Sequence, residues 1–387
     1  MDKKENFNII DFGSSKIRFT VFDKDLNNRY IDTVEIKLTD NISSQLTNVQ
    51  KLIKQAEKKN SSHIENTILL FDTPDVFTID VSLNKTFSNK IDLKKIYSLT
   101  ILELKQIINT NYQNQEIIHI IQNRCLVDEK EYNQIPKNKF KAKNLKVEFK
   151  IICYPKKIIS NLNKSFNEIG IKIEKIFCTS FIKSQSYFNK IGKNKISFLE
   201  IGLKRSTLII YEKKKLKLIQ SIPIGGSHIT NDISKIFKIT PEEAERIKIS
   251  FSKSDIEFSY KNESNVNYVS TDDILKKNIS IDLLKKVILY RIQEIVDLIF
   301  KKSTNLINNI HAKDSELLLI GDGSILFNNN SFYLNDKFMF KSIDFYKETN
   351  LEICNSCLVY HLNNYEIPEI LEKKQGIFEK FFNFFSK

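Results

Sequence analysis

Short apolar runs bounded by polar residues predict an α/β chain whose first part alternates strands with helices. Strand-like runs lie at residues 7–10, 17–22, 67–71 and 171–177. Helical patterns lie at residues 42–59, 157–169 and about 180–190. The first two strands flank the polar turn Asp11-Phe-Gly-Ser-Ser-Lys16, which predicts a β-hairpin with a carboxylate, two hydroxyls and a lysine at its tip.

The same plan of strand, acidic residue, glycine and second strand recurs about half the chain length later. Residues 196–237 predict two strands around a turn that carries Glu200 and Gly202, then a third strand, then a helix that opens at Gly225-Gly226. Repetition of the Asp11 hairpin on this scale predicts two related halves with a ligand held between their turns.

The remaining segments complete the expected architecture. After the second hairpin come a Pro-containing capping box at 240–243, a polar loop at 254–272, a long helix at 281–302 and a strand at 316–320. Between the halves, strands at 76–83, 116–122 and 147–153 surround a helix at 93–109 and a polar loop at 133–143. The second group predicts an inserted α+β subdomain.

Composition narrows the class of protein. The chain has 387 residues, is 41% hydrophobic and carries a formal net charge of +13, so it is long enough for a folded core and basic overall. Its basic residues are dispersed, which argues against a nucleic-acid partner. The N-terminus does not resemble a signal peptide, and the lone Cys354-x-x-Cys357 is weak evidence for zinc or redox chemistry.

The positions of the glycines indicate which turns could bind a ligand. The chain has only 9 glycines, and six of them fall in four short turns: Gly13, Gly202, Gly225, Gly226, Gly321 and Gly323. Turns with free amides, hydroxyls and a lysine can hold phosphate oxygens, as Ser14, Ser15 and Lys16 would do beside Gly13. A neighbouring carboxylate can hold magnesium through water.

The order of these turns resembles the actin/Hsp70-type ATPase superfamily. The run IPIGGSHITNDISKIFKITPEEAERIK, residues 222–248, resembles the FtsA family of cell-division actin homologues, and residues 116–136 resemble that family's inserted SHS2-type subdomain. The resemblance implies an actin-like, ribonuclease H-like duplicated α/β fold. A nucleotide cleft, the inserted α+β subdomain and a C-terminal amphipathic helix would belong to it.

The resemblance also implies a domain plan. The two halves would be 1–72 with 156–192 (subdomain 1A) and 193–231 with 303–361 (2A). The smaller units would be 73–155 (1C) and 232–302 (2B), followed by a linker at 362–375 and a membrane-targeting helix at 376–387.

ATP and Mg²⁺ are the cofactors that the resemblance implies. The residues assigned to the nucleotide are Asp11, Gly13, Ser14, Ser15, Lys16, Gly202, Lys204, Gly225, Gly226, Glu245, Lys248, Gly321, Gly323 and Ser324. Asp11 would hold the metal through water, and Asp11 and Glu200 are the catalytic candidates.

The second turn departs from the family pattern. Where the family has Asp-x-Gly-Gly-Gly-Thr, this chain has Glu200-Ile-Gly202-Leu-Lys-Arg-Ser-Thr207. The side chains of Leu203 and Lys204 would hinder close backbone approach to a γ-phosphate, although Lys204 and Arg205 could hold phosphate by charge. Asp322 similarly replaces a glycine in the last turn. These changes predict ATP binding with weak or absent hydrolysis.

The C-terminal segment has the pattern of an interfacial helix. At 100° per residue its apolar residues cover one face, namely Ile377, Phe378, Phe381, Phe382, Phe384 and Phe385. Lys380 and Lys387 flank this face. This arrangement favours reversible binding to an anionic membrane, while docking on the protein body is the alternative.

The family's role supplies the functional hypothesis. The resemblance implies a cytoplasmic protein, peripheral on the inner membrane face at the division site, that polymerises with itself, binds the FtsZ C-terminal tail and recruits later division proteins. Lys285, Lys286 and Arg291 on the long helix could meet acidic groups of that tail, or simply face solvent. The alternatives are a pilus-assembly-type actin homologue and a hydrolysing actin/Hsp70-type ATPase.

Overall fold

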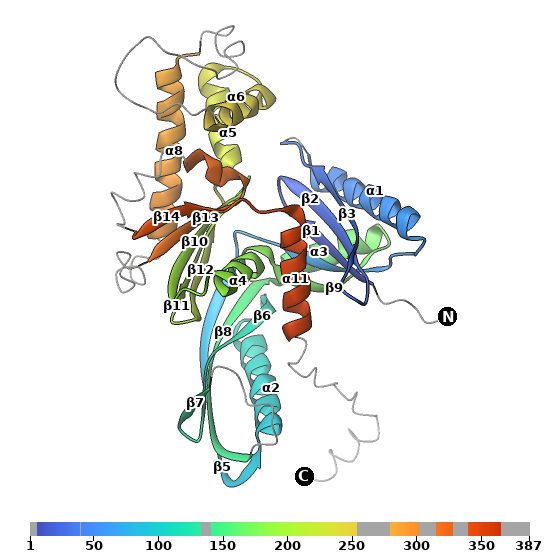
Figure 1. Ribbon diagram of the computed structural model, residues 1–387, viewed down its shortest axis with the longest axis vertical. Helices are drawn as coiled ribbons and strands as arrows, with labels where there is room; N and C mark the ends of the chain where they lie inside the picture. Colours follow the sequence, from blue (N-terminus) through green and yellow to red (C-terminus); the bar gives the residue numbers. More distant parts are fainter. Residues whose placement is uncertain are drawn as a thin grey trace.

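The computed structural model describes residues 6–38, 40–132, 141–253, 279–301, 315–327 and 340–364. The loop expected at 254–272, the membrane helix at 376–387 and most of the linker at 362–375 lie outside the described residues. Figure 1 shows one sheet at the right of the molecule, a second at the left and an inserted sheet at the lower end.

Two five-stranded sheets with the same strand order form the centre of the fold. The first is β3 (Asn28–Glu35), β2 (Lys16–Phe22), β1 (Phe7–Phe12), β4 (Asn66–Phe71) and β9 (Lys172–Cys178). The second is β12 (Lys215–Ile222), β11 (Ser206–Glu212), β10 (Lys195–Ile201), β13 (Glu316–Ile320) and β14 (Ser342–Phe345). In each, three antiparallel strands are followed by two parallel ones. The predicted duplication is therefore confirmed.

Amphipathic helices pack in each half of the fold. The first half has α1 (Ile42–Asn60) and α3 (Lys156–Glu168), and the second has α5 (Gly226–Phe237), α6 (Pro241–Lys253) and α8 (Ile281–Lys301). The apolar stripe of α8, with Ile288, Ile292, Ile295 and Ile299, is buried in the same core as strand residue Leu208. Its spacing of four and three residues places these side chains on one face of the helix.

Two helices join the halves of the fold. The sequence patterns did not predict the hydrophobic core that these helices form between the two sheets. The helices are α4 (Thr179–Ile191) and α11 (Asn350–Asn364), and α11 continues into the segment expected to be linker. One core cluster contains Leu70 of the first sheet and Phe198 of the second. Cys354 and Cys357 are buried there on α11, and burial raises the pKa of Cys354 to about 12. The Cys-x-x-Cys pair therefore belongs to the core.

The inserted unit is a four-stranded antiparallel sheet with one helix. Its order is β5 (Phe77–Asp92), β8 (Lys141–Pro155), β6 (Gln115–Val127) and β7 (Lys130–Tyr132), with α2 (Leu93–Asn111) packed on it. The loop predicted at 133–143 has the wrong end, because β8 already begins at Lys141. The strands extend beyond their apolar centres since backbone pairing continues through polar residues.

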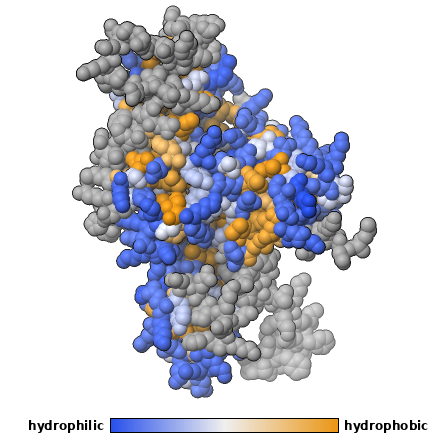
Figure 2. Space-filling model, in the orientation of Figure 1, coloured by the Kyte–Doolittle hydropathy of each residue, from blue (hydrophilic) through white to orange (hydrophobic). Residues whose placement is uncertain are grey.

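The first hairpin is also longer than its polar sequence suggests. Asp11 pairs with Arg18 and Phe12 with Ile17 across the strands, so Asp11 and Lys16 are strand residues rather than turn residues. The turn itself is reduced to residues 13–15. The surface is mixed, and in Figure 2 hydrophilic side chains cover the region of α1 while hydrophobic ones gather near the middle of the visible face.

His119 fastens the inserted sheet to the body. Its Nε2 accepts a hydrogen bond from the Cys178 amide at 2.9 Å, so the neutral ring carries its proton on Nδ1, which lies 3.0 Å from the Tyr360 hydroxyl. The ring also stacks on Phe177 at 5.4 Å between centroids. Burial lowers the pKa of His119 from 6.5 to about 3, because the charged form would lose its hydration here.

This buried histidine makes stability depend on pH. The unfolded chain takes up a proton at His119 below its ordinary pKa of 6.5, whereas the folded chain does not until about 3, so stability falls across that window. Between about pH 7.5 and pH 5.5, the stability advantage of the wild type over His119→Gln should shrink by about 1.4 kcal/mol in urea unfolding. Phe177→Leu removes the stacked ring without a titrating group, and its effect should not change with pH. If the stability difference between the wild type and His119→Gln were the same at both pH values, His119 would not be the group that makes stability depend on pH.

Candidate functional site

The second acidic turn is the centre of a buried charge network. Glu200, near the end of β10, is only 5% exposed. Its carboxylate accepts from the Lys183 ammonium of α4 at 2.5 Å and from the Ser180 hydroxyl. Burial alone would raise the pKa of Glu200, but Lys183 and Arg205 together lower it to about 2. The two neighbouring cations therefore favour the ionised form of Glu200.

Lys183 joins a second carboxylate to this network. Its ammonium lies 3.0 Å from Glu348, which also accepts from the Tyr187 hydroxyl at 2.9 Å. Burial raises the pKa of Glu348, although Lys183 opposes that rise. The ammonium thus lies between two buried carboxylates, and attraction from Glu200 and Glu348 raises the pKa of Lys183 in spite of its desolvation.

Arg205 crosses from one half of the molecule to the other. It belongs to the turn between β10 and β11, and its guanidinium pairs with Asp72, which follows β4 of the first sheet. The same guanidinium donates to Thr207 at 2.6 Å and to Ser180 at 3.1 Å. Asp72 also accepts from the backbone amide of Ser180 at 3.1 Å, at the start of α4. Two sheets and one connecting helix meet in this contact.

The first acidic turn has a cation of its own. Arg18, across the hairpin from Asp11, donates to the Asp11 carboxylate at 2.6 Å, and its Nε donates to Asn350 of α11 at 2.7 Å. Asp11 is 3% exposed. Burial raises the pKa of Asp11 even though Arg18 and Lys183 act to lower it.

A magnesium ion does not fit this set of carboxylates. Mg²⁺ requires near-octahedral oxygen ligands and usually keeps several waters. Asp11, Asp72 and Glu200 are instead buried against Arg18, Arg205 and Lys183. Among the described residues, no group of three or more His, Cys, Asp and Glu side chains could hold a metal ion.

The Gly225-Gly226 segment approaches the second turn rather than open space. The amide of Gly226 donates to the Gly202 carbonyl at 2.9 Å, and the amide of Ser227 donates to the Leu203 carbonyl at 2.8 Å. A Cβ on Gly225 would lie 2.4 Å from the Gly202 oxygen. These glycines therefore allow two backbone segments to touch, and their predicted contact with nucleotide stays a prediction.

The last turn packs on the end of β10 in a similar way. Gly321 has a φ of +86°, and a Cβ there would lie 2.7 Å from the Ile201 carbonyl oxygen. Ser324 closes the turn by donating to the Gly321 carbonyl at 2.7 Å. Asp322 pairs with Lys16 of the first hairpin at 3.1 Å, so the last turn contacts the first hairpin of the other half.

Glu245 and Lys248 form a pair that fastens α6 to α5. The Lys248 ammonium lies 2.7 Å from Glu245, 2.9 Å from the Thr230 hydroxyl and 3.1 Å from the Gly226 carbonyl. Burial lowers the pKa of Lys248, although Glu245 opposes the change. The pair thus supports the helix start at Gly226, and a contact with the ribose or base stays a prediction.

The other predicted residues are placed as follows. Gly13, Ser14 and Ser15 form the first turn, and Lys204 is exposed at the second. Arg291 already binds Asp232 through two hydrogen bonds of 2.6 and 2.9 Å, while Lys286 is exposed. The predicted membrane residues lie outside the described part of the chain.

The predicted site residues omit five members of the network, namely Arg18, Asp72, Ser180, Lys183 and Glu348. Only Asp72 carried a signal, as an acidic residue at a strand end before Thr-Pro. Lys183 lies within a helix and gave no motif, because its role depends on residues distant in the sequence.

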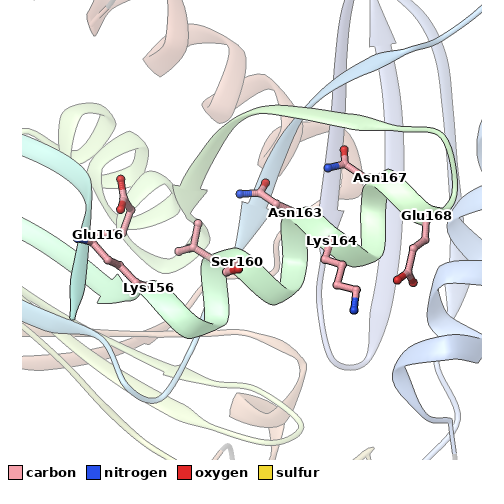
Figure 3. Close-up of a pocket in the computed structure, with 8 residues that line it drawn as sticks. Glu116, Lys156, Ser160, Asn163, Lys164, Asn167 and Glu168 are labelled. Atoms are coloured by element: carbon pink, nitrogen blue, oxygen red, sulfur yellow. The ribbon is translucent and has the colours of Figure 1, made fainter. Parts of the chain in front are cut away.

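Two surface pockets lie away from these turns. The larger, of about 890 Å³, runs along α3, where Figure 3 shows Ser160, Asn163, Lys164 and Asn167 on successive turns. A second pocket, of about 500 Å³, lies among the inserted sheet, β9 and the end of α11. Neither is lined by a residue of the four glycine turns.

Comparison with known proteins finds one family over part of the chain. The family model described as cell division protein FtsA matches residues 198–331, which include both the second and the last turn. Over these residues the chain is similar to the FtsA proteins. FtsA of Bacillus subtilis (strain 168) is 30% identical over 149 residues, which cover 38% of this chain and 33% of that protein. FtsA of Buchnera aphidicola subsp. Baizongia pistaciae is 24% identical over 286 residues, covering 72% and 65%.

The matched stretches thus span between a third and two thirds of these FtsA relatives. Among solved structures, a PilM–PilN type IV pilus biogenesis complex matches with a TM-score of 0.58 and 10% identity, covering 90% of each chain. At this identity the match concerns the fold alone, and it agrees with the duplicated actin-like architecture. Within the described residues, the helices are too short or too polar to cross a membrane.

Proposed function

We propose that this chain is a cell-division scaffold that binds ATP, assembles as an actin-like filament and tethers FtsZ to the inner face of the cytoplasmic membrane. The observation that carries the proposal is the FtsA match over residues 198–331, on a duplicated actin-like fold. Later division proteins would be recruited to the same filament at the division site.

ATP would bind between the two halves, near the turns that meet there. Lys16 and the exposed Lys204 are the cations with access to solvent that could neutralise phosphate oxygens. The hydroxyls of Ser14 and Ser15 would contribute hydrogen bonds from the first turn. Lys16 would have to exchange its exposed partner Asp322 for phosphate, which is a small loss because surface ion pairs contribute little.

Hydrolysis is expected to be slow because the candidate base is already engaged. Glu200 has a pKa near 2 and accepts from Lys183 and Ser180, so it is poorly suited to take a proton from water. Asp11 is likewise paired with Arg18. This arrangement favours a scaffold over a hydrolysing ATPase of the chaperone or sugar-kinase type.

Phosphate release by the purified full-length chain should therefore stay near the background of ATP alone. Ordinary enzymes turn over at about 1–1,000 per second. A rate within that range, abolished in a heat-denatured control sample, would show that Glu200 or Asp11 is free to act and would contradict this expectation.

The membrane tether would be the segment 376–387. Its five phenylalanines would gain about 2 kcal/mol each on insertion, before the cost of ordering the helix is subtracted. Attraction of the flanking lysines to anionic lipid would add to this. Filament formation would strengthen binding further, because linked weak sites bind with higher avidity.

Deletion of residues 376–387 should abolish co-sedimentation of the chain with anionic liposomes. Phe382→Ser should weaken lipid binding by about tenfold or more, since one buried phenylalanine is lost. Asn383→Ser, on the polar side of the predicted helix, is the matched control and should bind as the wild type does. If the deletion variant still binds lipid, segment 376–387 is not the membrane tether.

For the FtsZ tail, the exposed Lys286 remains a candidate contact on α8, and Lys285 lies beside it. Arg291 is less available, because Asp232 holds its guanidinium by two hydrogen bonds. A pilus-assembly scaffold is the second candidate function, and the only observation that favours it is the fold-level match to the PilM–PilN complex.

A further inference from the structure

Three carboxylates at strand ends between the two halves are each paired with a cation of the chain itself. Asp11 pairs with Arg18 at 2.6 Å, Glu200 with Lys183 at 2.5 Å, and Asp72 with Arg205. The six side chains come from β1, β2, α4 and β10, and from the segments after β4 and before β11. The cations therefore surround the place where the acidic turns of the two halves approach each other.

The charge balance leaves little attraction for a divalent ion. Three carboxylates face three cations. A fourth acid, Glu348, shares Lys183 and accepts from Tyr187, so the cluster has a formal charge of only −1. A metal ion placed among these residues would be repelled by two guanidinium groups and an ammonium in a poorly hydrated site. Repulsion of this kind is much stronger in the protein interior than in water.

The guanidinium of Arg205 is a positive charge held in a fixed position, and it neutralises the acids of the site without a metal ion. Its planar group donates at once to Thr207, Ser180 and Asp72, which fixes its position. Arginine stays charged under all ordinary conditions, unlike a metal ion that can dissociate. In addition, Arg205 joins the first half to the second without any ligand.

We propose that Arg205 and Lys183 take the place of the divalent cation in this cleft, so that the chain binds nucleotide triphosphate independently of magnesium. This inference rests on the proposed ATP binding and deepens it by specifying the form of nucleotide that is bound. Arg205 and Lys183 neutralise the acids of the cleft, and the solvent-accessible Lys16 and Lys204 meet the phosphates.

The test is calorimetric titration of the full-length chain with ATP, once with excess magnesium and once with excess EDTA. The proposal predicts dissociation constants that agree within about threefold, which corresponds to less than 1 kcal/mol. An affinity at least about tenfold weaker in EDTA would overturn the metal-independent site while leaving the proposed ATP binding intact. Failure to bind ATP in both buffers would overturn the proposed nucleotide function, and this inference with it.

A second experiment tests magnesium binding without nucleotide, by measuring the unfolding temperature with and without magnesium. Magnesium alone should not raise the unfolding temperature of the wild type. Arg205→Gln frees Asp72 and part of Glu200, so magnesium should raise the unfolding temperature of this variant. Lys193→Gln removes an exposed cation far from the cleft acids and is the matched control. If Arg205→Gln does not fold, the titration of the wild type decides alone. A wild type stabilised by magnesium would overturn the proposal.

Discussion

A buried guanidinium that bridges the two halves is the constraint on which this structure depends. Arg205 leaves the second hairpin and pairs with Asp72 at the end of β4, while Ser180 at the start of α4 binds both. Removing either partner of a buried pair leaves an uncompensated charge, which costs far more than the intact pair contributes. The relative position of the two sheets is therefore tied to the position of α4.

The glycine turns show how backbone segments come together where the two halves meet. Gly225 and Gly226 touch the backbone of the second turn, and Gly321 touches the end of β10. At Gly225 and Gly321 a side chain would collide with these backbone segments whether or not nucleotide is present. Leu203 contacts the start of α5 through its backbone carbonyl, which accepts from the Ser227 amide, so its side chain does not prevent this contact. These glycines therefore lie where backbone segments of the chain contact one another.

The sequence predicted the repeated hairpins, the long helix α8 and the strand β13, because local periodicity and turn residues determine such elements. It did not predict α11, whose buried face is wide and includes two cysteines as well as Ile353 and Leu358. The partners of Glu200 were equally invisible, since Lys183 and Glu348 come from distant segments and only the tertiary fold brings them together. Asp11 and Glu200 were predicted as site residues, whereas their partners Arg18 and Lys183 were not.

The most direct test of the central contact is a double-mutant cycle between Arg205→Met and Asp72→Asn. The free energy of unfolding of both single variants and of the double variant would be measured in urea, without nucleotide or metal. If Arg205 and Asp72 bridge the halves, their coupling energy should reach about 2–3 kcal/mol, because each single change leaves a buried charge unpaired. A coupling energy below about 0.5 kcal/mol would contradict the account.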